Sequence, residues 1–388
     1  MMKRYFVTQM QLQEVSSSRH YGALDGIRGL AILLVFFYHY GDLSQSSSRL
    51  LRFVGHVKSS GWIGVDIFFV LSGFLITGIL YESRNEIHYY RRFYIRRALR
   101  LFPVFYGVCL VTLLLAPVLH LQWHWSYLAI LLYGTNIIVV LDPLTRRVGP
   151  FEITPLWSLA LEEQFYLLWP LAVHLLKTRE RVLRLSLGVI ILAFAARITA
   201  LHTGVPVAAI YWELPTRMDS LAAGAALALL LRGPKKERWE SIARHSLVPL
   251  WSALLLMGVY EHGLGLLDPI TIVAGYTLLA LGSAALIAEA LRPSSWIALI
   301  FSNPMLRFLG KISYGLYVYH TLAWTGAKPV FDFLQRHLHS QLAAGIGVYV
   351  IFFGGTVLFS YLSYRFYEVK FLRLKDSLAP APKRARPA

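Results

Sequence analysis

Two ionisable side chains lie eleven residues apart in one apolar stretch near the beginning of the chain. The stretch runs from Leu24 to His39 and carries Asp25, Arg28 and His39 among aliphatic and aromatic residues. If it is one helix, an advance of about 100° and 1.5 Å per residue places Arg28 and His39 on nearly the same face, roughly 16 Å apart along the axis. Asp25 shares that face because it precedes Arg28 by about one turn. Charged groups on one stripe of an apolar helix indicate a path lined by protein rather than a surface that faces lipid.

Carboxylates also occur inside later apolar stretches, where an unpaired charge is costly. Asp66 lies in the stretch 62–81, either as an interfacial carboxylate paired with an arginine or as part of a polar interior. Glu162 and Glu163 are adjacent, and because successive helical residues point about 100° apart, we expect only Glu162 to be central. Tyr166 shares the face of Glu162 one turn later. The alternative for Glu162 is a structural ion pair with an arginine inside the membrane.

Arginines mark two further candidate binding sites. Arg97 and Arg100 are one turn apart just before Pro103, and a guanidinium fork binds phosphate oxygens in a bidentate manner. Their spacing favours equally a second interpretation, in which both side chains anchor the chain at the membrane surface. Arg217 and Asp219 precede a helix of small residues. We expect these two either to pair across a turn or to bind polar substrate groups at a cavity rim.

A second histidine with two neighbouring hydroxyl residues, and a serine–glycine pair, are further candidate site residues. Ser313, Tyr317 and His320 follow helical spacing on one face of a late apolar stretch. His320 is more often a hydrogen-bonded packing residue than a catalyst in such a position. Ser72 and Gly73 permit close contact between helices. The sequence contains no zinc-ligand spacing, no glycine-rich nucleotide loop and no nucleophile elbow, so no metal is expected.

Composition identifies the class of protein that must position these groups. The chain has 388 residues, of which 56% are hydrophobic and only 15% are charged, and its mean hydropathy is +0.53. These values exclude a typical soluble enzyme and indicate an all-α polytopic membrane protein. The net charge of +17 is gathered in clusters between apolar segments, a pattern typical of cytosolic membrane loops rather than of a nucleic-acid surface. The single cysteine, Cys109, excludes an intrachain disulfide.

Charge clusters also predict the topology of the apolar segments. The basic loops 84–100 and 177–184 are both expected on the cytosolic side. Three apolar segments lie between them, and an odd number of crossings cannot return the chain to the same side. We therefore expect the shortest of the three, 126–141, to be a re-entrant or surface element, which leaves about ten crossings with both termini in the cytosol. The eleven apolar segments are 22–43, 62–81, 98–118, 126–141, 155–176, 184–201, 207–231, 246–260, 269–291, 313–330 and 341–365.

Three regions follow from these patterns. Residues 1–19 are polar and lack the apolar core of a signal peptide, so we expect a mobile cytosolic tail. Residues 20–373 are expected to form one integral membrane domain. Residues 374–388 are basic and rich in proline and alanine, which predicts a disordered cytosolic tail.

Taken together, these stretches resemble the membrane-bound acyltransferase family 3. The resemblance spans residues 20–373, and the order and spacing of the motifs make it specific although each motif alone is weak. The residues that carry it are Leu24-Asp-Gly-Ile-Arg-Gly29 with His39, Gly64-Val-Asp-Ile-Phe-Phe-Val-Leu-Ser-Gly-Phe74, Arg97 and Arg100 before Pro103, Trp157-Ser-Leu159 with Glu162 and Phe165-Tyr166, Arg217-Met-Asp219, and Ser313-Tyr-Gly-Leu-Tyr317 with His320.

The resemblance implies an enzyme of the inner (plasma) membrane. Such an enzyme takes an acyl group, commonly acetyl, from acyl-CoA on the cytosolic side and transfers it to a hydroxyl of a glycan, a lipid-linked sugar or a similar acceptor. No appended extracytoplasmic esterase-like domain is expected, and the oligomeric state is left open. The expected partners are acyl-CoA, the acceptor and membrane lipids, without nucleic acid.

The resemblance and the residue patterns together assign expected roles. The expected catalytic residues are His39, Glu162, Asp66 and Asp25. Phosphates of acyl-CoA are expected at Arg28, Arg97 and Arg100. Acceptor binding is expected at Arg217, Asp219, Ser72, Tyr166, Tyr317 and His320.

In the expected mechanism, neutral His39 is the general base on the acceptor hydroxyl. Asp66 or Glu162 orients the imidazole, and Arg217 steadies the oxyanion. A variant in which His39 carries the acyl group transiently is equally compatible with the sequence. The rival hypothesis is a non-enzymatic transporter or flippase for a lipid-linked glycan, in which the buried charges line a translocation path. The sequence shows no inverted repeat, which weighs against that rival.

Overall fold

The computed structural model describes residues 22–39, 49–118, 120–121, 124–142, 146–148, 151–324 and 326–380. The expected tail at 1–19 lies outside these residues. The described chain is almost entirely helical, and its strands are two short antiparallel segments paired Arg147 to Glu152 and Val148 to Phe151. The elements are α2 Gly22–His39, α3 Arg49–Ser59, η1 Ser60–Trp62, α4 Ile63–Ser83, α5 Tyr89–Leu114, α6 Ser126–Leu131, α7 Thr135–Leu141, β1 Arg147–Val148, β2 Phe151–Glu152, η3 Thr154–Leu156, α8 Trp157–Leu176, α9 Arg179–His202, α10 Val207–Trp212, α11 Leu214–Leu230, α12 Lys236–Tyr260, η4 Thr271–Gly275, α13 Tyr276–Ala290, α14 Trp296–Phe301, α15 Pro304–Lys311, α16 Ser313–Trp324, α17 Ala327–Leu338, α18 Gln341–Ser363, η5 Tyr364–Glu368 and α19 Val369–Leu378.

Seven helical stretches of the described chain are long and apolar enough to cross a membrane. This finding confirms an all-α membrane protein. The number of crossings, expected to be about ten, stays a prediction, because α11 and α16 have only 17 and 12 residues and α8 carries several polar side chains. The seven stretches are Gly22–His39, Arg52–Ser83, Tyr89–Leu114, Arg179–His202, Lys236–Tyr260, Thr271–Ala290 and Gln341–Leu378.

The segment expected not to cross, 126–141, is a broken element. It forms the two short helices α6 and α7, which are interrupted around Tyr133, whose φ is +54°. Two amide side chains fasten α7 to α8, since Gln164 Nε2 donates to Asn136 Oδ1 over 2.9 Å and to the Tyr133 carbonyl over 3.1 Å. Neither helix is long enough to span a bilayer.

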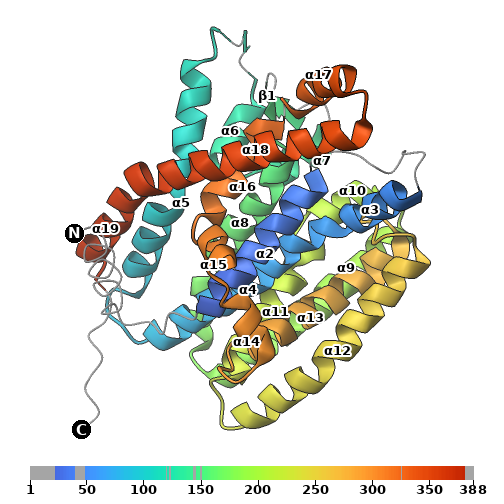
Figure 1. The fold of residues 1–388 in the computed structure, drawn as a ribbon. Coiled ribbons are helices and arrows are strands. Elements are labelled where there is room, and N and C mark those ends of the chain that lie inside the picture. Colours follow the sequence, from blue (N-terminus) through green and yellow to red (C-terminus); the bar gives the residue numbers. More distant parts are fainter. Residues whose placement is uncertain are drawn as a thin grey trace, which may run out of the picture.

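The centre of the molecule is built from α2, α4 and α11, with α12 on one flank and α5 on the other (Figure 1). Helices α4 and α11 touch through their backbones, because a Cβ atom built on Gly73 would lie 1.9 Å from the Leu221 carbonyl oxygen and one on Gly224 would lie 1.9 Å from that of Val70. Only glycine permits this approach. The close crossing holds the polar groups of both helices in a fixed register.

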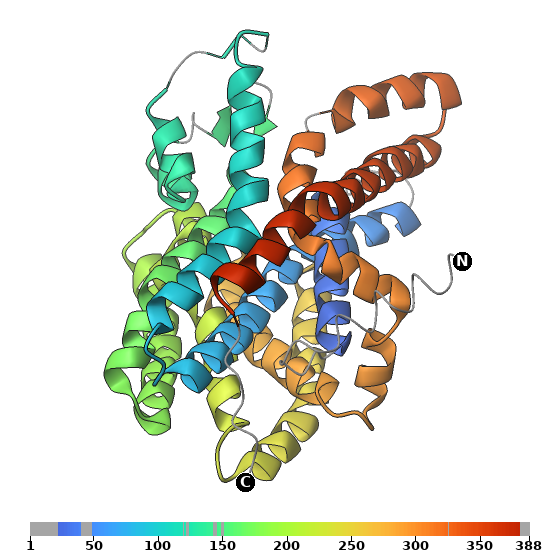
Figure 2. The same cartoon turned by 90° about the vertical axis from the view of Figure 1, so that its left-hand side faces the viewer.

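The C-terminal helix extends further than expected. Helices α18, η5 and α19 form one long stretch that crosses the face of the molecule and ends at Leu378 (Figure 2). The side chain of Arg96 on α5 bonds to Asp376 over 3.2 Å and to the Ala379 carbonyl over 2.7 Å. The first residues of the tail expected from residue 374, up to Leu378, are therefore helical, and Asp376 is bound to α5.

Candidate active site

Two histidines meet where α2 ends. His39 is the last residue of α2, and His320 is fully buried on α16. Their ring centroids lie 4.9 Å apart at an interplanar angle of 61°. The rings of Phe36 and Tyr317 lie 5.5 and 5.2 Å from that of His320. The structure thus joins an expected base with a histidine from the other end of the chain.

Each of these histidines has its Nδ1 atom against a backbone carbonyl. The distance is 2.8 Å from His39 Nδ1 to the Val35 oxygen and 2.5 Å from His320 Nδ1 to the Tyr317 oxygen. A carbonyl oxygen only accepts hydrogen bonds, so Nδ1 carries the hydrogen in both neutral rings. The basic lone pair of each neutral imidazole therefore lies on Nε2. For His39, a backbone group supplies the orientation that a carboxylate was expected to supply.

Tyr317 fixes α16 against the beginning of α8. Its hydroxyl donates to the Pro155 carbonyl over 2.8 Å and lies 2.5 Å from Ser158 Oγ. All three residues are buried. Tyr317 therefore holds His320, one turn away on the same helix, at a defined position.

Glu162 lies where α4, α5 and α8 meet. Its carboxylate accepts hydrogen bonds from Ser72 Oγ over 2.8 Å and from the Tyr166 hydroxyl over 3.0 Å. The guanidinium carbon of Arg97 lies 3.7 Å above the ring of Tyr166. Ser72 and Tyr166, expected to bind the acceptor, are thus the hydrogen-bond donors that satisfy Glu162.

The three arginines expected to bind phosphate gather from α2 and α5. Arg28 Nη1 bonds to Asp25 over 2.9 Å. Arg100 interacts electrostatically with Arg28, Arg97 and Asp25. Arg28 and Arg97 also interact with the carboxylate of Glu162. This arginine cluster, defined as Arg28, Arg97 and Arg100, concentrates positive charge at one place and suits an anionic group such as a phosphate.

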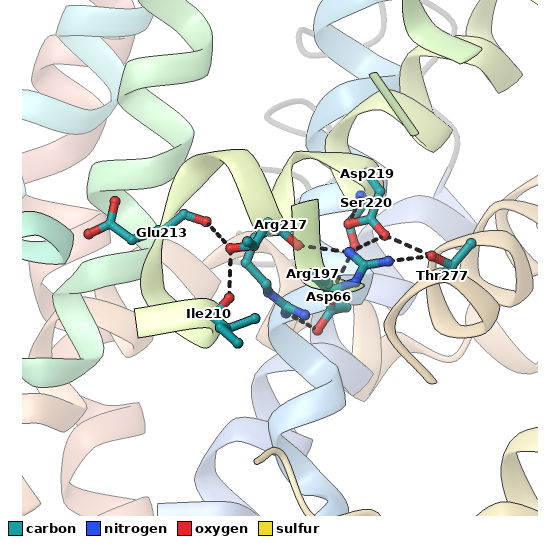
Figure 3. Close-up of polar contacts among 9 residues, drawn as sticks. Asp66, Arg197, Ile210, Glu213, Arg217, Asp219, Ser220 and Thr277 are labelled. Carbon is teal, nitrogen blue, oxygen red and sulfur yellow. Dashed lines mark hydrogen bonds and ion pairs between the residues drawn. The ribbon is translucent and has the colours of Figure 1, made fainter. Parts of the chain in front are cut away.

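A separate network of fully buried charges joins α4, α9 and α11 (Figure 3). Arg217 bonds to Asp66 over 2.7 Å, and Arg197 bonds to Asp219 over 2.8 Å, with all four side chains inaccessible to solvent. Ser220 Oγ donates to the other Asp66 oxygen over 2.7 Å. Of the two alternatives for Arg217 and Asp219, pairing with each other across a turn is wrong, because each of the two finds its partner on a different helix.

Arg197 is the member of this network that sequence reasoning missed. Its guanidinium donates to the Thr216 carbonyl over 2.7 Å and to Thr277 Oγ1 over 2.5 Å, and Thr277 donates in turn to Asp219 over 3.1 Å. The available signal was an arginine within the apolar segment 184–201, four residues before its end. Such a charge inside a membrane requires a buried partner.

The network also changes the interpretation of two expected site residues. The two carboxylate oxygens of Asp66 accept hydrogen bonds from Arg217 and Ser220. Asp66 is therefore bound to α11 rather than to His39, which it was expected to orient. The guanidinium carbon of Arg217 lies 3.9 Å above the ring of Tyr276. Cation–π contact and the ion pair together enclose Arg217 within protein. Arg217 and Asp219 are thus buried between helices rather than placed at a cavity rim.

No group of three or more histidine, cysteine, aspartate or glutamate side chains that could hold a metal ion occurs among the residues the structure describes. The chemistry available at the paired histidines is proton transfer. The hydrogen-bonded Glu162 and the arginine cluster lie elsewhere, on α2, α5 and α8, with Arg28 roughly 16 Å from His39 along the axis of α2.

Comparison with known proteins places these features in a family. The model of an acyltransferase domain family matches residues 21–365. The chain belongs to the membrane-bound acyltransferase family 3. The expected family is therefore confirmed, and the match includes every site residue described above.

Relatives of the chain carry longer sequences. It is 31% identical over 381 residues to a putative O-acetyltransferase of Staphylococcus aureus (strain COL), covering 91% of this chain and 57% of the relative. It is 30% identical over 370 residues to the peptidoglycan O-acetyltransferase OatA of Listeria monocytogenes serovar 1/2a (strain ATCC BAA-679 / EGD-e), covering 91% and 56%. It is 32% identical over 335 residues to the putative peptidoglycan O-acetyltransferase YrhL of Bacillus subtilis (strain 168), covering 80% and 50%. The chain thus spans about half the length of these relatives. No solved structure matches the chain.

Proposed function

We propose that this protein is an integral membrane O-acyltransferase that moves an acyl group, in the first instance acetyl, from acyl-CoA to a hydroxyl of a carbohydrate acceptor. Family membership supports acyl transfer, and the relatives named as peptidoglycan O-acetyltransferases support an O-acetyl product on a glycan. The observation that carries the proposal for this chain is the contact between His39 and His320, with the basic nitrogen of each ring fixed at Nε2 by a backbone carbonyl.

Acyl-CoA binds, in this proposal, with its phosphates at the arginine cluster. Arg28 and His39 lie on one uninterrupted helix, so their separation along the axis is roughly 16 Å. That distance is comparable to the reach of an extended pantetheine arm. A donor held by its phosphates at Arg28, Arg97 and Arg100 would therefore present its thioester near His39. We place this donor site on the cytosolic side of the inner membrane.

His39 then acts as the general base. Its Nε2 takes the proton of the acceptor hydroxyl, and the oxygen attacks the thioester carbonyl. The carbon–sulfur bond breaks, and the imidazolium returns the proton to the departing sulfur. The products are the O-acyl ester and free CoA thiol. His320, whose ring meets that of His39 edge to face, is a positioning residue in this scheme.

The remaining carboxylates have supporting roles in this proposal. Glu162, held by Ser72 and Tyr166, balances the positive charge of Arg28 and Arg97 at the donor site. Asp25 holds the Arg28 side chain toward the same place. Asp66 acts through the scaffold, because its partner is Arg217.

The test is acyl transfer by the purified protein. His39→Ala, incubated with labelled acetyl-CoA and a total membrane glycolipid fraction, should lose roughly 10²- to 10⁴-fold in the release of free CoA, the usual contribution of a general base. The matched control is His337→Ala, which removes an exposed histidine on α17. Wild-type turnover by His39→Ala would refute the assignment of the base. Absence of CoA release from the wild-type protein with every membrane acceptor would instead favour the transporter hypothesis.

A further inference from the structure

A cavity of about 430 Å³ is lined by side chains of α5, α6, β2 and α16. The β1–β2 pair lies at one end of the molecule (Figure 2). The cavity volume falls within the range of small-molecule sites in proteins. The walls are almost entirely hydrocarbon, and the charged group among them is the carboxylate of Glu152. The wall includes Val108, Leu110 and Leu113 of α5, together with Leu156 and Val318.

Part of the cavity wall is exposed at the molecular surface. Leu110 and Leu113 line the cavity and are 56% and 62% exposed. Both lie on α5, one of the helices long and apolar enough to cross a membrane. Exposed leucines on such a helix face the hydrocarbon of the bilayer. A molecule that enters the cavity from this side must therefore present a hydrocarbon chain.

The inner wall of the cavity adjoins the proposed site of chemistry. Val318 and Leu156 line the cavity, and their neighbours in the chain, Tyr317 and Pro155, share the hydrogen bond of 2.8 Å described above. The ring of Tyr317 lies 5.2 Å from that of His320. Tyr317 and Pro155 therefore connect the cavity wall to the histidine pair.

The position of the cavity along α5 distinguishes the acceptor from the donor. Arg97 and Arg100 lie on the first half of this helix, whereas the cavity is lined by its second half, from Phe105 to Leu113. The twelve residues from Arg97 to Cys109 correspond to roughly 18 Å along the axis. A donor held by the arginine cluster and a chain held in the cavity thus approach the histidines from opposite ends of α5.

We propose that this cavity binds the hydrocarbon chain of a lipid-linked acceptor, so that a hydroxyl of its polar head reaches His39. This inference rests on the proposed function and names the class of acceptor: a lipid that carries a hydroxyl-bearing head group. Glu152 lies at the cavity with its carboxylate held by Thr154 and Arg147. It provides a hydrogen-bond acceptor for the hydroxyls of that head group.

The probe for this site is a hexadecyl glucoside with a photoreactive diazirine in its chain. Irradiated with the full-length protein in nanodiscs, it should label peptides from the second half of α5. A phosphatidylcholine with the same diazirine chain reports on bulk lipid. Val108→Trp fills the cavity, and Val111→Trp is the matched control, because Val111 lies on the same helix but is exposed and outside the cavity wall.

We expect Val108→Trp to reduce glucoside labelling of α5 at least fivefold and Val111→Trp to leave it unchanged. Equal labelling of these peptides by the phosphatidylcholine probe, or unchanged labelling in Val108→Trp, would overturn the proposal. Photolabelling needs no turnover, so the cavity is tested even if acyl transfer is not the activity. If the wild-type protein shows no labelling of α5 while Val108→Trp still releases CoA, the cavity is not the acceptor site. The proposed function is unaffected by that outcome.

Discussion

Substitution of Asp66 tests whether the buried charge network is a scaffold or part of the chemistry. Asp66→Asn keeps the shape of the side chain and removes its charge, leaving the Arg217 guanidinium buried without its carboxylate. Breaking a buried ion pair on one side costs about 3–5 kcal/mol. The contact of Arg217 with the Tyr276 ring at 3.9 Å stays in place, and such contacts contribute up to about 2 kcal/mol. We therefore expect a loss near the lower limit, about 3 kcal/mol.

The assay is reversible unfolding in mixed micelles, followed by tryptophan fluorescence, with acyl transfer measured on the same preparation. The control is Asp376→Asn, which removes the carboxylate of a half-exposed pair with Arg96. That variant should lose no more than about 1 kcal/mol. Replacing both partners, with Asp66→Leu and Arg217→Met together, should restore most of the stability, because no charge is then left buried alone.

A scaffold role for Asp66 is contradicted if Asp66→Asn unfolds with the free energy of the wild-type protein but no longer transfers acyl groups. That outcome would return Asp66 to the role expected from the sequence, as the residue that orients His39. Parallel loss of stability and activity, with both recovered in the double variant, would establish the scaffold.

Two further predictions concern the donor site and the helix crossing. Replacing both Arg97 and Arg100 by alanine should raise KM for acetyl-CoA at least tenfold with little change in kcat, since each charge-assisted hydrogen bond contributes about 1.5–3 kcal/mol. The control is Arg91→Ala, because Arg91 is exposed on the same helix. An unchanged KM in the double variant would contradict the donor site. Gly224→Ala should destabilise the protein by about 1–3 kcal/mol or more, because its Cβ would meet the α4 backbone. Gly354→Ala, which meets nothing within 4 Å, should not, and equal unfolding midpoints of the two variants would show that α4 and α11 can separate freely.

Sequence patterns were sufficient for features that depend on one helix. The stretch containing Arg28 and His39 is a single helix, and Tyr166 does lie on the face of Glu162 and bonds to it. The segment 126–141 could be recognised as unusual because its length and its Gly-Thr-Asn interruption are local properties. Helical periodicity fixes which residues share a face, so such predictions need no knowledge of neighbouring helices.

Features that depend on contact between helices could not be predicted in the same way. Arg217 and Asp219 are two residues apart in the sequence, yet they bind partners on α4 and α9. Periodicity cannot choose among the several oppositely charged groups that a membrane helix might meet. Composition likewise does not reveal that the polar α19 is held by the side chain of Arg96 on α5.

The glycines of the first motif explain how the two histidines are brought together. Cβ atoms built on Gly26 and Gly29 would lie 1.8 and 2.0 Å from the carbonyl oxygens of Phe301 and Leu306, so the beginning of α2 touches the backbone of α14 and α15. Helix α16 begins two residues after α15 ends and packs on α2 as well. The glycine contacts therefore set the register of the α15–α16 segment along α2. With one end of this segment fixed at the glycines, the other end places His320 beside His39, which accounts for a motif near Arg28 acting on a site roughly 16 Å away.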